Sequence, residues 1–137
     1  MKAADFGHME QNMNGTLLTY IGSFLPFAWG IAHLFPTRNV VRSFGDISPD
    51  NKRTITMEWI NEGVFLIFLG VLAAMVTYCD RHSLITQIVC WTVFGALNTL
   101  SLVSLFTGFR NSFLPFKLCP YIFTGSSILL VIGSRFG

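Results

Sequence analysis

Four apolar stretches of about 20 residues each restrict this chain of 137 residues more than any other feature of it. They cover residues 16–35, 58–78, 84–106 and 112–133. A helix of about 20 residues crosses a hydrocarbon core about 30 Å thick. Runs such as FLIFLGVLAAMV lack the polar and apolar alternation of a membrane β-strand. The sequence therefore predicts an all-α integral membrane protein with four spanning helices.

The links between the last three stretches are short, which restricts how the helices can be arranged. CDRHS joins the second stretch to the third, and TGFRN joins the third to the fourth. Such short links make consecutive helices antiparallel neighbours, so we expect an up-and-down four-helix bundle. Because 12% of the residues are charged, against about 25% in soluble domains, we expect one transmembrane domain over residues 1–137 and no soluble domain.

The polar loop at residues 36–57 is longer than a simple chain reversal requires. Its second half has the pattern of a helix start, with Ser48 as N-cap, Pro49 in the first helical position and Asp50 beside the positive end of the helix dipole. The second helix is therefore expected to begin at Pro49. Residues 38–44 place three apolar side chains around two arginines, which fits either an amphipathic segment on the membrane surface or a solvated loop.

Lysine and arginine counts near the ends of the spans predict the orientation in the membrane. Five lie on the side of the long loop and three on the side of the termini. Basic residues favour the cytoplasmic side, so both termini are predicted to be non-cytoplasmic. The five are Arg38, Arg42, Lys52, Arg53 and Arg110, and the three are Lys2, Arg81 and Arg135.

Small residues occur in all four spans and predict close packing between helix backbones in lipid. This packing could join helices of one chain or two copies of it, so the oligomeric state is left open. The residues are Gly22, Pro26 and Gly30 in the first span, Gly63, Gly70 and Ala74 in the second, and Gly95 and Gly125 in the last two.

Ionisable side chains inside a span are the first candidates for function, because one at the bilayer centre costs at least about 2.5 kcal/mol unless it is paired or hydrated. Glu58 and Glu62 lie one turn apart on one helical face, where two carboxylates repel each other, so the deeper Glu62 is expected either to gain a proton or to pair with His33 or Lys117. We interpret these residues as a polar mouth over an apolar pocket. All four lie near span ends that meet the long loop: His33, Glu58, Glu62 and Lys117.

Two residues of the third span complete the predicted ligand-binding set. Asn98 could supply a hydrogen bond, and Trp91 lies on the same face two turns earlier. Each residue also has a structural interpretation. His33 and Lys117 could be interfacial side chains, Asn98 could bond a neighbouring helix, and Trp91 could pack. Glu62 is the hardest to explain structurally, because a long apolar run follows it.

Known catalytic and cofactor motifs do not occur in the sequence. It has no G-x-S-x-G, H-E-x-x-H, P-loop or G-x-G-x-x-G motif, so no catalytic residue or cofactor is predicted. The three cysteines form no C-x-x-C pair, and neither a metal site nor a disulfide is expected. A net charge of +2 without a basic run predicts no nucleic-acid partner.

The segments AWGIAHLFPTRNVVRSFGDIS and MEWINEGVFLIFLGVLAAM resemble the layout of the DoxX-like small four-helix membrane proteins. The resemblance covers about half the chain and depends on His33, Glu62, Gly63 and Gly70. It implies the four-helix fold, and it implies association with quinone-linked oxidoreductases, as described for some members of that group. A second, weaker likeness is to sterol-isomerase-like membrane proteins, in which intramembrane acids lie beside tryptophan and asparagine.

Three functions follow as expectations. The first is an accessory or structural subunit of a larger membrane complex, such as a quinone-linked or respiratory one. The second is a protein that binds an apolar small molecule, a lipid or a quinone, with its polar mouth at Glu62. The third is an intramembrane acid/base enzyme of the isomerase type, with Glu62 as acid or base. The bilayer is the one partner expected in all three cases.

Overall fold

The computed structural model describes residues 3–108 and 114–135, with side chains for residues 13–108 and 116–135. The elements are α1 (Ala3–Leu34), α2 (Thr37–Ser43), α3 (Pro49–Asp80), α4 (Leu84–Val103), a π-helical turn η1 (Ser104–Gly108) and α5 (Leu114–Arg135). Four segments are long and apolar enough to cross a membrane: Met13–Leu34, Pro49–Asp80, Leu84–Gly108 and Phe116–Arg135. The chain is thus an all-α, multi-pass membrane protein, as predicted. Residues 109–113, with Arg110 and the start of the predicted fourth span, lie outside the described residues.

The long loop contains the helix start that the sequence predicts. The backbone N–H of Asn51 donates to Ser48 Oγ at 3.2 Å, and Pro49 occupies the first position of α3. Residues 37–43 form α2, which packs against α3 and buries Val40. Helix α1 starts at Ala3, well before the predicted span, and its polar first turns mix good helix formers such as Ala, Met, Glu and Gln with poor ones such as Gly and Asn.

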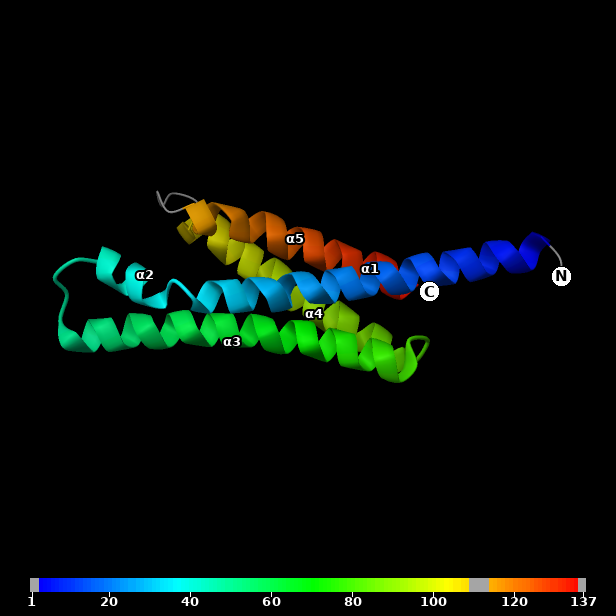
Figure 1. Ribbon diagram of the computed structural model, residues 1–137, viewed down its shortest axis with the longest axis horizontal. Helices are drawn as coiled ribbons and strands as arrows, with labels where there is room; N and C mark the ends of the chain where they lie inside the picture. The colour runs from blue at the N-terminus through cyan, green and yellow to red at the C-terminus, as the bar shows by residue number, and fades with distance from the viewer. Residues whose placement is uncertain (1–2, 109–113, 136–137) are drawn as a thin grey trace.

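The four long helices form an up-and-down bundle in which α1 is central. It packs along α3 on one side and α5 on the other, and α4 packs mainly on α5 (Figure 1). Helices α3 and α4 lie close together at their connecting turn and separate toward the end that carries α2 (Figure 1). Fully buried side chains from three helices fill the core: Leu66, Ala73, Val93, Leu97, Phe123 and Leu130.

Glycines let α1 and α3 approach backbone to backbone. A Cβ atom on Gly30 would lie 2.6 Å from the carbonyl oxygen of Gly63, and one on Gly70 would lie 2.5 Å from the carbonyl oxygen of Ser23. Both distances are shorter than any real Cβ contact. The predicted packing role of the glycines is therefore confirmed for α1 and α3, and it joins helices of one chain.

The glycines of the other spans divide into two groups. Gly22 packs on α5, where an added Cβ would lie 2.9 Å from the backbone nitrogen of Leu130. Cβ atoms on Gly95 and Gly125 would meet no atom within 4 Å. These two glycines therefore make no close backbone contact with the described helices of the same chain, and the alternative of a contact between two copies stays a prediction.

Candidate functional site

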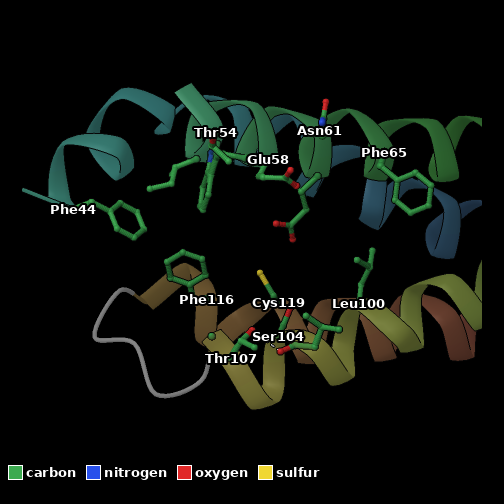
Figure 2. Close-up of a pocket in the computed structure, with 15 residues that line it drawn as sticks. Phe44, Thr54, Glu58, Asn61, Phe65, Leu100, Ser104, Thr107, Phe116 and Cys119 are labelled. Atoms are coloured by element: carbon green, nitrogen blue, oxygen red, sulfur yellow. Dashed lines mark hydrogen bonds between the residues drawn. The ribbon is translucent and has the colours of Figure 1, made fainter. Parts of the chain in front are cut away.

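A cavity of about 630 Å³ lies where α3 has separated from α4, at the end of the bundle that carries the long connection (Figure 2). This volume is within the range of about 300 to 1,000 Å³ that is typical of small-molecule sites. One wall is the first half of α3, from Thr54 to Phe65, which is about 16 Å of helix at 1.5 Å per residue. The other wall combines the end of α4, η1 and the first turns of α5, and Phe44 borders the cavity beyond α2.

The α3 wall carries the two acidic side chains. Glu58 is exposed and points into the cavity, whereas Asn61 points away from it (Figure 2). Glu62 lies one turn further along, and 32% of its side chain is exposed. Phe65 follows on the same wall, while Leu66 is turned into the core. Glu58, Glu62 and Phe65 are spaced at i, i+4 and i+7, so one stripe of α3 changes from acidic to apolar along the cavity.

His33 joins this wall from the end of α1. Its carbonyl oxygen accepts a hydrogen bond of 2.7 Å from Trp59 Nε1, and its ring stacks on the Trp59 ring with centroids 3.8 Å apart. This arrangement directs His33 Nε2 toward Glu62 Oε2, at 3.5 Å. His33 and Trp59 are 6% and 7% exposed, so the histidine is a buried neighbour of Glu62 behind the wall. Of the two residues predicted as partners of Glu62, His33 is the one that contacts its carboxylate in the structure.

The opposite wall is mostly apolar with a few small polar groups. Phe116 and Cys119 point into the cavity from α5 (Figure 2). The Phe116 ring also forms an edge-to-face pair with the Trp59 ring, with centroids 5.5 Å apart. Ser104 and Thr107 lie on η1, where the i to i+5 pattern of a π-helix replaces the α-helix. π-Helical turns are rare and frequently occur at functional sites, and this one forms part of the cavity wall.

Three residues of the predicted site lie apart from this cavity. Lys117 is half-buried in the first turns of α5 and is not one of the lining residues, although Phe116 and Cys119 on either side of it are. Asn98 donates to Ser127 Oγ at 2.9 Å and so joins α4 to α5. Trp91 lies toward the opposite end of the bundle, where the Arg135 guanidinium is 5.0 Å from its ring centroid. The structure therefore brings together His33, Glu58 and Glu62.

Sequence reasoning missed most of the opposite wall. Ser104, Thr107, Phe116 and Cys119 line the cavity, and none of them was a candidate. The only signal for the first two was a pair of hydroxyl side chains one turn apart at the end of an apolar span. No local pattern marks Phe116 or Cys119, since their place depends on how α5 faces α3.

No family model, curated protein or solved structure matches this chain. The resemblance to the DoxX-like proteins stays a prediction, and the geometry of the cavity is the basis for a functional proposal.

Proposed function

We propose that this small multi-pass membrane protein binds an apolar molecule with a polar head in the cavity between α3 and α4. The observation that carries the proposal is the composition of the walls. Glu58 lies between Phe44 and Phe116 at the long-loop end and Phe65 and Leu100 further along the bundle (Figure 2), and Glu62 follows one turn after Glu58 on the same wall. A ligand in the cavity can therefore place its head beside Glu58 and Glu62 and its tail against Phe65 and Leu100.

The geometry of Glu62 supports binding more than a purely structural role. A residue that served only to pair with His33 would be covered by its neighbours. Instead, a third of the Glu62 side chain remains exposed and faces the cavity, while His33 is buried behind it. Glu62 can therefore keep its contact with His33 and accept a hydrogen bond from a ligand at the same time.

The proposal is tested by filling the cavity. Ser104→Trp combined with Thr107→Trp places two indoles on the cavity wall. The matched control is Thr92→Trp combined with Thr99→Trp, at exposed positions of α4 that do not line the cavity. Both control threonines donate their hydroxyls to the carbonyl four residues earlier in the helix, as Thr107 does, so the control includes the kind of hydrogen bond that Thr107→Trp removes.

The measurement is native mass spectrometry of the protein extracted in mild detergent. We expect a bound mass in the range of lipids or quinones on the unchanged protein and on the control, and its loss from the cavity-filled variant. Equal retention by both variants would contradict the proposal. A partner chain of fixed stoichiometry, retained by both variants, would favour the accessory-subunit role, which stays a prediction from the sequence.

A further inference from the structure

The charged residues that line the cavity have one sign. Glu58 and Glu62 are both on its wall, and the described lining residues include no lysine or arginine. Within the described part of the chain, His33 approaches this wall from behind, with its Nε2 3.5 Å from Glu62 Oε2. Even a protonated His33 would offset only one of two ionised carboxylates, and no lysine or arginine among the described lining residues is placed to offset the other. A ligand with an anionic head would be repelled, whereas a cationic head would be attracted.

Aromatic rings line the same cavity as the carboxylates. Phe44, Phe65 and Phe116 come from the loop after α2, from α3 and from α5, and Trp59 adds a fourth ring that His33 covers on one face. Phe44 and Phe116 lie toward the long-loop end of the cavity, and Phe65 lies beyond the acidic pair (Figure 2). The faces of aromatic rings attract cations, and several rings around one site are the usual way in which proteins recognise alkylated ammonium groups.

On these two grounds we infer that the ligand head is an alkylated ammonium group, held between Glu58 and Glu62 and the aromatic rings, and attached to an apolar tail. This inference rests on the proposed function and names the class of its ligand. A zwitterionic phospholipid carries the same ammonium, but its phosphate would lie close to the two carboxylates without a basic partner among the described lining residues. The cavity therefore favours an amphipathic amine without a phosphate.

The test compares amphiphiles with one chain and different heads. The purified protein in a neutral maltoside detergent is titrated with dodecyltrimethylammonium, dodecanol or dodecylphosphocholine, and its thermal unfolding midpoint is followed. Because a ligand that binds the folded state raises this midpoint, the concentration at half-maximal effect reports its relative affinity. We expect the ammonium compound to act at a concentration at least about tenfold lower than the other two.

Variants that remove one carboxylate charge test whether the ammonium group binds beside Glu58 and Glu62. Glu58→Gln and Glu62→Gln should each raise the half-maximal concentration of dodecyltrimethylammonium by about tenfold and leave that of dodecanol unchanged. Asp80→Asn removes one negative charge from the opposite end of α3 and should change neither value. Because Glu58 is exposed, its glutamine variant provides the test even where Glu62→Gln weakens the fold.

Three results would overturn the inference: equal potency of dodecanol, equal potency of dodecylphosphocholine, or no effect of either glutamate substitution. The cavity-filled variant Ser104→Trp with Thr107→Trp separates this failure from failure of the proposed function. If one of these results is found and that variant raises the half-maximal concentration of all three amphiphiles, the cavity binds ligands but does not prefer ammonium. If it weakens none of them, the proposed function fails as well.

Discussion

Replacing Gly70 with alanine tests whether backbone approach sets the contact between α1 and α3. The new methyl group would lie 2.5 Å from the carbonyl oxygen of Ser23 and 2.8 Å from Cβ of Phe27. Favourable contacts between carbon atoms lie at about 3.5 to 4.0 Å, so a shift of about 1 Å is required. The carbonyl of Ser23 belongs to the backbone of α1 and cannot rotate away like a side chain, so the two helices must separate.

The expected magnitude combines two effects of opposite sign. Overpacking a well-packed contact costs about 1 to 3 kcal/mol. Alanine in place of glycine inside a helix gains about 1 kcal/mol through helix propensity. Gly95→Ala is the matched control, since it gives the same propensity gain at a position where Cβ meets no atom within 4 Å. Gly70→Ala should therefore be about 1 to 3 kcal/mol less stable than Gly95→Ala.

The assay is reversible unfolding in mixed micelles of dodecyl maltoside and dodecyl sulfate, followed by helical circular dichroism. Gly125→Ala serves as a second control, because its Cβ also meets no atom within 4 Å. Stabilities of Gly70→Ala and Gly95→Ala within about 0.5 kcal/mol of each other would refute the reasoning, because that is the usual scatter for independent sites. The α1–α3 contact would then be loose enough to admit a methyl group.

Three further predictions concern the buried polar groups and the topology. A double-mutant cycle of Glu62→Gln and His33→Phe in the same unfolding assay should give a coupling free energy of at least about 0.5 kcal/mol, and additive losses would show that the 3.5 Å contact is not a pair. The corresponding cycle of Asn98→Ala and Ser127→Ala should give about 0.6 kcal/mol, the usual value for a hydrogen bond between membrane helices, and a coupling near zero would place the Asn98 amide elsewhere. A single cysteine in place of Asp50 should resist an impermeant thiol reagent in intact cells, while one at the C-terminal end of α5 should react, and the reverse result would invert the orientation.

Much of the fold was predictable from local sequence. The four spans follow from the length of the apolar stretches, because only a helix satisfies its own backbone hydrogen bonds in lipid. The start of α3 at Pro49 follows from the cap at Ser48, since a cap involves residues within a single turn. The helical first turns of α1 were missed, because a polar segment without a cap or a hydrophobic pattern gives no such signal.

Some features of the candidate site also follow from local sequence, and others follow only from how the helices pack. Glu58 and Glu62 share a face at any tertiary arrangement, because a spacing of four residues is one helical turn. The partner of Glu62 was left open between two residues, and the stacking of His33 on Trp59 decides it. Asn98 was assigned to the pocket, but its hydrogen bond to Ser127 depends on which face of α4 meets α5.

Sequence alone determined the class of this protein and the shared helical face of its acidic residues, because hydropathy and helical periodicity are properties of neighbouring positions. Tertiary structure alone decided that a cavity exists, because it arises where α3 separates from α4 while both remain packed through α1 and α5. Its far wall is formed by residues about 40 or more positions away from Glu62, such as Ser104 and Phe116. Contacts of this kind depend on the angles and rotations at which helices pack, and the glycines that allow α1 to approach α3 are among the residues that set them.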